Sequence, residues 1–374
     1  MFNQNACVPF LRMQTVFLAL ALVIISGFAS AQESKPTSLS AYWPTDAWRT
    51  STPEQQGMDS AQLARMFAEI NQQHFSLNSV LIIRHGYLVT EVYVPPFQAD
   101  TKRKIYSITK SIISALVGIA LDQGYLHDVN QKALDFFTDR TIANNDTRKH
   151  VITLKHLLTM TSGLQPSTQD RGDIVQKTLN LPMVAKPGVK WDYNTDSTHL
   201  LSAILQKVTG QSALAFAQTQ IFTPLGITDV AWSTDANGVN IGGSALKMTP
   251  RDLAKFGYLY LHGGVWNGRQ VVPRDWVQTS TAKQVDCTEK RGYGYLWWQM
   301  PFGGYAALGY GGQEILVFPE HDLVVVFTTS PMDEKKLWKL VSDFILPAVR
   351  SGEPLPANPK GVESLESQIR AIEG

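Results

Sequence analysis

Short apolar, strand-like runs lie near both ends of this 374-residue chain, with a helical block between them. Near the N-terminus, two runs within residues 79–93 flank His85-Gly86, which predicts a β-hairpin. Further runs near the C-terminus, separated by Gly, Pro and Asp, span residues 295–299, 306–308, 314–318 and 323–329. A sheet assembled from both ends would carry helices on its faces, and the block at about 120–245 would form a second, all-helical region. We therefore predict an α/β fold with a cleft where the two regions meet.

Hydrophobic periodicity and capping residues predict the main helices. Asp59-Ser60 begin one that runs to about residue 72. A capping threonine followed by proline, Thr249-Pro250, begins another that ends near residue 261. The remaining predicted helices span residues 105–121, 153–160, 195–209 and 334–349. A short charged helix follows in the Pro-rich tail, and we expect that tail to be peripheral to the fold.

Ser107-Ile108-Thr109-Lys110 stands at the head of the apolar helix predicted at 105–121. Positions i and i+3 lie on one helix face, so the Ser107 hydroxyl and the Lys110 amine can meet. A serine hydroxyl needs an adjacent base to act as a nucleophile. A lysine on an apolar helix face has a lowered pKa and can be that base. The alternative is that Ser107 only caps the helix.

The Ser-x-x-Lys pattern also occurs at 244–247 and 280–283, so spacing alone does not identify the site. Only the copy at Ser107 opens a long helical run with apolar residues at helical spacing. The copy at 244–247 ends against a helix start signal, and the copy at 280–283 lies in a polar stretch. The context therefore favours Ser107 and Lys110.

Two further segments could complete an acyl-transfer site. Tyr193 lies on a predicted loop after Pro187-Gly188, and a phenol held against a lysine ammonium has a lowered pKa and can relay a proton. A buried aromatic that anchors the loop is an equal alternative. Glycines at 309, 311 and 312 would let a strand edge approach a ligand, so that a backbone N–H there and that of Ser107 could form an oxyanion hole. A tight turn between two strands explains the same glycines.

Taken together, these motifs resemble those of the serine β-lactamase-like hydrolases, within them the class C and aminohexanoate-dimer hydrolase branch. The resemblance covers roughly residues 50–350 and rests on segments 107–111, 152–164, 187–193, 242–254, 263–268 and 311–313. It implies a β-lactamase/D-alanyl peptidase-like fold, with Ser107 as nucleophile, Lys110 as its base and Tyr193 as proton relay. It also implies the N–H groups of Ser107 and Tyr310 as oxyanion hole. The expected substrate-binding residues are Thr195, Gly309, Gly311 and Gln313.

The chain departs from the family pattern at two places. It has Tyr193-Asn194-Thr195 where the family often has Tyr-x-Asn, and Ala307-Leu308-Gly309 where β-lactamases have Lys-Thr-Gly. Because that lysine recognises the β-lactam carboxylate, its absence favours an esterase or amidase that cleaves a small substrate. A β-lactamase, a D-alanyl-D-alanine peptidase, a sensor that is acylated without turnover, and an inactive relative remain alternatives.

Aromatic and histidine side chains offer weaker candidates. Trp297 and Trp298 could line an apolar pocket, but core strand positions are the stronger interpretation. His85 is interpreted as a turn residue and His156 as structural. The eight histidines show no ligand-spaced cluster, so we expect neither a metal nor a cofactor.

The N-terminus has the pattern of a secretory signal peptide. Arg12 precedes an apolar run at 16–25, and Ala29-Ser30-Ala31 follows as a small-residue cleavage site. An uncleaved anchor is the alternative. We expect a signal peptide at 1–31, a linker at 32–50, a catalytic domain at 51–350 and a tail at 351–374. With the resemblance, this implies an exported bacterial protein, periplasmic and without stable membrane insertion.

Composition excludes some partners and leaves others open. The formal net charge is +1 and no basic patch or zinc-finger spacing is present, so nucleic acid is not an expected partner. Loss of residues 1–31 would leave Cys287 as the only cysteine, which excludes an internal disulfide. The expected partner is a small-molecule ester or amide. The sequence predicts no oligomeric state.

Overall fold

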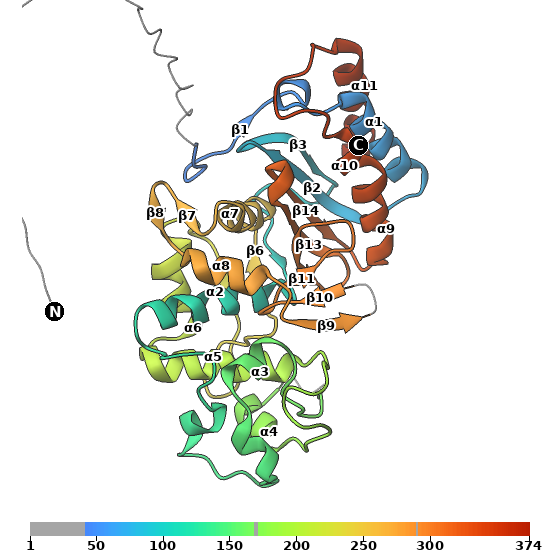
Figure 1. Ribbon diagram of the computed structural model, residues 1–374. Helices are drawn as coiled ribbons and strands as arrows, with labels where there is room; N and C mark the ends of the chain where they lie inside the picture. The colour runs from blue at the N-terminus through green and yellow to red at the C-terminus, as the bar shows by residue number, and fades with distance from the viewer. Residues whose placement is uncertain (1–41, 168–170, 289–290) are drawn as a thin grey trace, which may run out of the picture. The chain divides into compact units, whose positions relative to one another are not determined.

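One nine-stranded sheet in the computed structural model combines strands from both ends of the chain (Figure 1). The structure describes residues 42–167, 171–288 and 291–374. The strand order is β1-β3-β2-β14-β13-β12-β11-β10-β9. The strands are β1 (Arg49–Thr50), β2 (Leu77–Arg84), β3 (Tyr87–Tyr93), β9 (Val285–Thr288), β10 (Arg291–Tyr293), β11 (Trp298–Gln299), β12 (Tyr305–Gly309), β13 (Gln313–Phe318) and β14 (Leu323–Thr329). The predicted α/β fold with a sheet from both ends is thus confirmed.

The pairing of β2 with β14 joins the two ends of the chain at the centre of the sheet. The strands are antiparallel, with Arg84 opposite Leu323 and Val80 opposite Phe327. Every residue of both strands is buried, as expected for strands covered on both faces. The β2–β3 hairpin turns at His85 and Gly86, both with positive φ, so the interpretation of His85 as a turn residue is confirmed.

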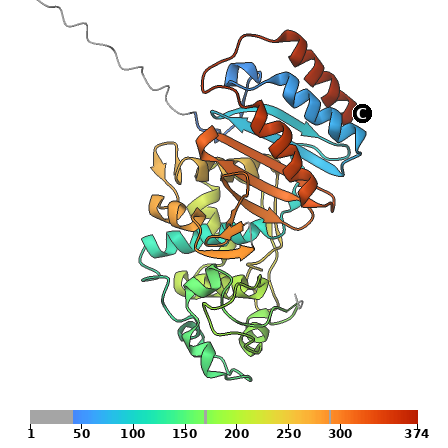
Figure 2. The same ribbon diagram turned by 45° about the vertical axis from the view of Figure 1, so that its right-hand side comes forward.

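Helices cover both faces of the sheet (Figure 2). Alternate residues of β14 face opposite sides: Leu323, Val325 and Phe327 pack with α1 (Ser60–Gln72) and α9 (Glu334–Leu340), whereas Val324 and Val326 pack on the side of α2 and α7. The helices on the second side are α2 (Ile108–Asp122), α7 (Pro250–Leu261) and α8 (Arg274–Thr281).

The helical region follows α2 in the chain and packs against it. Its helices are α3 (Leu154–Leu158), α4 (Ile174–Asn180), α5 (Thr195–Thr209) and α6 (Ala213–Ala217). Helix α5 contacts α2, α3, α4 and α6, so it is the centre of this region. Asn194 caps its first turn, and Gly210 ends it in the left-handed conformation.

Helix α2 begins later than the sequence predicts. Residues 103–104 form strand β4 (Arg103–Lys104), which pairs with β6 (Leu246–Met248); β6 also pairs with β5 (Ala231–Trp232). Tyr106 then has φ 47°, which no helix allows, and the helix starts directly after Ser107. The predicted final helix is likewise divided, because a π-helical turn, η6 (Val341–Ile345), separates α9 from α10 (Leu346–Ala348).

The predicted linker and the predicted tail both pack onto the fold. In the predicted linker, the Trp43 ring contacts the Tyr258 ring edge to face and the Trp266 ring at a tilt. Strand β1, at the end of this segment, pairs with β3. The tail forms α11 (Pro359–Glu373), which packs along α1 and buries Leu365. The tail is therefore not peripheral: its helix supplies apolar contacts that cover the outer side of α1. The predicted signal peptide lies outside the described residues.

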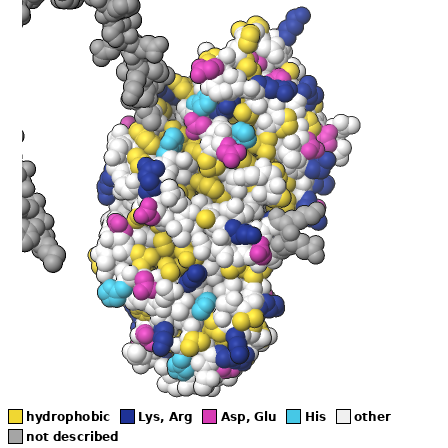
Figure 3. All heavy atoms as spheres, viewed as in Figure 1, with side chains coloured by type: hydrophobic (Ala, Val, Ile, Leu, Met, Phe, Trp, Pro, Cys, Tyr) yellow, Lys and Arg dark blue, Asp and Glu magenta, His cyan; other side chains and the backbone are white. Residues whose placement is uncertain are grey.

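The described surface carries charges of both signs. In Figure 3, basic and acidic side chains are interspersed over the visible face. Across the ranges that the structure describes, no helix is both long enough and apolar enough to cross a membrane.

Candidate active site

The first turn of α2 positions the predicted nucleophile and base. Ser107 precedes the helix but makes no side-chain capping bond, so its hydroxyl does not serve the helix backbone. The Lys110 side-chain nitrogen lies 3.0 Å from the Ser107 Oγ. The structure therefore brings together the two side chains that the spacing predicts, and it contradicts the simple capping role.

Lys110 is buried and held from a second side. It is 1 % exposed, and its Nζ donates to the carbonyl oxygen of Gly243 at 2.6 Å. Burial lowers the pKa of Lys110 to about 7, and the nearby Asp196 carboxylate opposes this shift only in part. A substantial fraction of the amine is therefore uncharged near neutral pH and can accept the serine proton.

Tyr193 lies beside Ser107 and Lys110, but the prediction that its pKa is lowered is wrong. Burial raises the pKa of Tyr193 to about 12, and a hydrogen bond with Ser107 offsets this only partly. The Lys110 Nζ lies 4.9 Å from the centre of the Tyr193 ring, over its face. Because Lys110 is itself buried and easily deprotonated, it does not draw the phenol toward ionisation. Tyr193 is thus a neutral phenol that can give its own proton to one group while it accepts a proton from another.

The turn between β12 and β13 lies beside the nucleophile. A Cβ at Gly309 would overlap the carbonyl oxygen of Ile105, so only glycine permits this approach. The ring of Tyr310 contacts that of Tyr106 edge to face at 5.5 Å. The Ser107 N–H is at a helix start, where backbone donors lack intrahelical acceptors. The oxyanion hole formed by the N–H groups of Ser107 and Tyr310 stays a prediction that this close approach supports.

A cavity of about 750 Å³ opens over these groups. Its lining residues are Ser107, Tyr193, Arg291, Trp298, Leu308, Gly309, Tyr310, Gly311, Gly312, Pro331, Met332, Asp333 and Glu334. This volume is in the range of small-molecule sites. The predicted substrate-binding residues Gly309 and Gly311 are part of the lining.

Gln313 and Thr195 are not part of this lining. Gln313 is 2 % exposed, and its side-chain amide donates to the Thr329 carbonyl at 2.8 Å. The prediction that Gln313 binds substrate is therefore wrong, because its side-chain amide is hydrogen-bonded to the backbone of Thr329 on the neighbouring strand. Thr195 is exposed and lies against Gly243, so it borders the lysine-binding carbonyl.

Several site residues carry no clear signal in the sequence. Trp297 is fully buried beside Tyr260, as the core interpretation predicts. Its neighbour Trp298 instead lines the cavity, and its ring stacks on that of Tyr193 with the ring centres 5.8 Å apart. In the strand predicted at 295–299, successive residues would face opposite sides, and that alternation could have separated the two tryptophans. In the structure, the strand begins only at Trp298. The Gly243 carbonyl had no comparable signal, because a backbone acceptor can belong to any residue.

The other sequence candidates have structural roles. His156 accepts a hydrogen bond from the Thr153 N–H at the start of α3, which confirms its structural interpretation. In the second Ser-x-x-Lys copy, Lys247 is exposed on β6. In the third, Ser280 donates to the Val277 carbonyl. Within the described ranges, no three His, Cys, Asp or Glu side chains gather closely enough to hold a metal ion.

Comparisons with known proteins agree with this geometry. A family model described as Beta-lactamase matches residues 54–349. An uncharacterized protein of Alkalihalophilus pseudofirmus is 27% identical over 297 residues, covering 66% of this chain and 82% of its own. The 6-aminohexanoate-dimer hydrolase of Paenarthrobacter ureafaciens is 23% identical over 301 residues, covering 72% of this chain and 76% of its own.

The fold also matches solved structures. A Bacillus anthracis protein provisionally described as a 6-aminohexanoate-dimer hydrolase superposes with a TM-score of 0.70 at 19% identity. The match covers 85% of this chain and 91% of that protein. At this identity the likeness establishes the fold.

Proposed function

The chain belongs to the Beta-lactamase family of serine hydrolases, and we propose that it cleaves a small ester or linear amide through an acyl-enzyme on Ser107. The observation that carries the proposal is the contact of a buried, readily deprotonated Lys110 with the Ser107 hydroxyl, beside the neutral phenol of Tyr193. Ser107 and Tyr193 line one cavity, and the buried Lys110 contacts Ser107, so a nucleophile, a base and a proton relay lie together there.

The reaction proceeds in two halves. Lys110 accepts the Ser107 proton while the Oγ forms a bond to the substrate carbonyl carbon, and the backbone N–H groups bind the oxyanion. The carbon–oxygen or carbon–nitrogen bond then breaks, and the leaving group receives that proton through Tyr193. Water next attacks the acyl-enzyme and gives one proton to Lys110. Collapse of the second tetrahedral intermediate returns that proton to Ser107 and releases the acid.

Strand β12 favours an ester or linear amide over a β-lactam. Where β-lactamases carry a lysine on this strand, the chain has Ala307, which is buried on β12. The position therefore supplies no cation for the β-lactam carboxylate. The name of the Paenarthrobacter relative supports inclusion of a linear amide among the substrates to be tested.

A substrate panel tests the proposal. Purified protein is assayed with p-nitrophenyl esters of increasing acyl length, with the linear 6-aminohexanoate dimer and with a chromogenic cephalosporin. Ser107→Ala and Lys110→Ala serve as controls, and each is expected to lose several powers of ten in kcat. Ester or amide turnover that survives Ser107→Ala would contradict the acyl-enzyme. Efficient cephalosporin hydrolysis would instead favour a β-lactamase, and stable labelling by a fluorescent penicillin without turnover would favour a sensor.

The proposal includes export to the periplasm. Its support is the sequence pattern of Arg12, an apolar run and Ala29-Ser30-Ala31. Mass spectrometry of protein from the periplasmic fraction of a bacterial host should find a chain that begins after Ala31. A full-length chain confined to the cytoplasmic fraction would contradict this part.

A further inference from the structure

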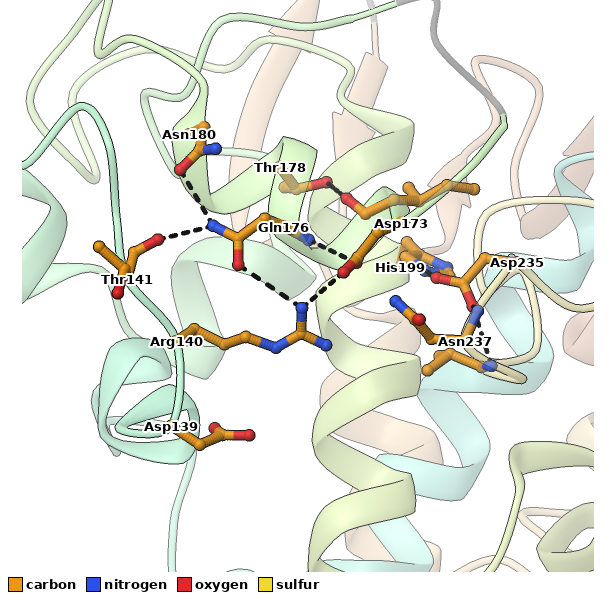
Figure 4. A network of polar contacts seen from close by, with 12 residues as sticks. Asp139, Arg140, Thr141, Asp173, Gln176, Thr178, Asn180, His199, Asp235 and Asn237 are labelled. Atoms are coloured by element: carbon orange, nitrogen blue, oxygen red, sulfur yellow. Dashed lines mark hydrogen bonds and ion pairs between the residues drawn. The ribbon is translucent and has the colours of Figure 1, made fainter.

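A buried histidine–aspartate pair lies behind the carbonyl that binds Lys110. His199 is on α5, and its Nε2 lies 3.2 Å from the Oδ2 of Asp235 (Figure 4). The two side chains are 2 % and 0 % exposed. Neither residue lines the cavity over Ser107, and the acyl-transfer steps do not involve either of them.

Hydrogen bonds define which ring nitrogen carries the proton. The backbone N–H of Gly242 donates to the His199 Nδ1 at 3.4 Å, so that nitrogen must present a lone pair. The proton of the neutral ring is then on Nε2, where it is donated to the Asp235 carboxylate. Asp235 thus selects the tautomer that leaves Nδ1 free to accept from Gly242.

Asp235 also shapes the loop that contains Gly242. Its Oδ1 accepts from the N–H groups of Asn237 at 2.9 Å and Val239 at 3.0 Å. Gly242 lies so close to α5 that a Cβ there would be 2.8 Å from the Ser202 Cβ. The loop is therefore held against α5 both by packing and by the imidazole.

The next residue in the chain is the lysine acceptor. Gly243 follows Gly242, and its carbonyl oxygen lies 2.6 Å from the Lys110 Nζ. A neutral amine that donates one proton to this carbonyl can direct its lone pair toward Ser107. A displacement of Gly242 would move that carbonyl and rotate the amine.

We propose that His199 is a positioning residue: its neutral imidazole, oriented by Asp235, holds the Gly242 N–H and so keeps the Gly243 carbonyl where it orients the Lys110 amine. The inference rests on the proposed function, because it assigns His199 a role in preparing the base of that reaction. It adds a buried residue of α5 to the determinants of turnover.

Burial and the nearby carboxylates shift the pKa of His199 in opposite directions. Burial lowers the pKa of His199, whereas Asp235 in the loop and Asp173 at the start of α4 raise it. Asp173 is itself paired with Arg140 at 2.5 Å, as Figure 4 shows. Asp196 lies on the same helix and interacts with Lys110, which binds the Gly243 carbonyl. If Nδ1 were protonated, its N–H would face the backbone N–H of Gly242, and the hydrogen bond between them would be lost. The arrangement therefore requires the neutral imidazole.

Two substitutions at His199 separate positioning from bulk packing. Asn has a carbonyl oxygen near the place of Nδ1 and can still accept from Gly242, whereas Leu fills similar space without an acceptor. We expect His199→Leu to lower kcat by ~10- to 100-fold, the range for a small misplacement of a catalytic group. KM should stay within about twofold, because His199 does not touch the cavity, and the acid limb of the kcat/KM profile should shift. His199→Asn should recover most of the kcat.

Thr178→Val is the matched control. Thr178 is buried on α4, which packs against α5, and its hydroxyl donates to the Ile174 carbonyl at 2.7 Å. Its loss should lower stability without changing kcat. Equal kcat losses in His199→Leu and His199→Asn, a parallel rise in KM, or an equal loss in Thr178→Val would overturn the proposal.

The tautomer provides a test that does not depend on turnover. In wild-type protein labelled with ¹⁵N-histidine, the His199 resonances, assigned by comparison with His199→Asn, should show a protonated Nε2 and an unprotonated Nδ1. The opposite tautomer would overturn the inference even if His199→Leu fails to fold. The Ser107→Ala variant separates failure of the proposed function from failure of the positioning role. Turnover that survives Ser107→Ala refutes the proposed function. If Ser107→Ala abolishes turnover but His199→Leu has wild-type kinetics, only the positioning role is refuted.

Discussion

Gly243 presents its carbonyl oxygen to the side-chain nitrogen of Lys110 at 2.6 Å. The amine therefore contacts both a backbone acceptor and the hydroxyl that we propose it deprotonates. This relationship explains how a flexible side chain can serve as an oriented base. It also makes a residue without a side chain important for turnover.

Gly243→Ala should lower kcat by ~100-fold with little effect on KM, since small misplacements at the reacting groups have effects of that size. An added Cβ would lie 2.9 Å from the Thr195 carbonyl oxygen, so the backbone must shift and carry the lysine acceptor with it. Steady-state kinetics on the best ester substrate measure the effect. Gly352→Ala is the control, because no atom lies within 4 Å of a Cβ there. Equal kcat values for the two variants would contradict the role of Gly243.

Turnover should rise with pH and reach half its maximum near the pKa of Lys110, about 7. The base must be unprotonated, so activity is lost as pH falls through this value and reaches a plateau above it. A kcat/KM profile of the free enzyme between pH 5 and 9 measures this pKa. An acid limb centred near 4 would instead indicate a carboxylate base.

Tyr193→Phe should reduce kcat by ~10² to 10⁴, the usual contribution of a positioned proton donor. The Phe ring can retain the stacking on Trp298, so circular dichroism and the unfolding temperature should change little. Because the pKa of Tyr193 is about 12, we expect no basic limb from it below pH 10. Full activity of the Phe variant would remove Tyr193 from the reaction.

Glu314 is a buried carboxyl group whose ionisation should destabilise the fold. Burial raises the pKa of Glu314 to about 8, with a further contribution from Glu334, and the Trp338 indole donates to its Oε1 at 3.2 Å. The folded state thus retains a proton that the unfolded state releases near its usual pKa of about 4.3. Stability should fall as pH rises between these values, by at most about 1.4 kcal/mol per pH unit.

Glu314→Gln provides the matched comparison for that titration. The amide keeps an acceptor for Trp338 and cannot ionise, so the variant should gain stability over wild type as pH rises from 5 to 8. Urea unfolding at several pH values measures the difference. A constant difference between the two proteins across this range would show that Glu314 does not titrate there.

Local signals predicted the helices that have clear caps. The predicted range 195–209 matches α5, which Asn194 caps at its start and Gly210 ends. The predicted range 249–261 includes α7, which Thr249 caps. These start and stop signals act within one helical turn. The start of α2 was placed too early, because the strand pairing of residues 103–104 and the positive φ of Tyr106 depend on distant residues. The tail was misjudged for the same reason, since α1 provides its partner surface.

At the site, side-chain identities were predictable but their environments were not. Ser107, Lys110 and Tyr193 were predicted from motif spacing and resemblance, and the structure brings them together. The pKa of Tyr193 was predicted in the wrong direction, because burial depends on tertiary packing. His199 gave no signal, because its role arises from the position of one backbone N–H.

The pairing of β2 with β14 has a consequence for the synthesis of this protein. Val80 can pair with Val92 in the β2–β3 hairpin, but its partner on β14, Phe327, is made only near the end of the chain, so the centre of the sheet must wait for most of the polypeptide. Contacts between such distant residues slow folding, since the intervening loop must close first. Strands β12 and β13, against which α2 packs, are likewise made late, so the helix that carries Lys110 gains this support only near the end of translation.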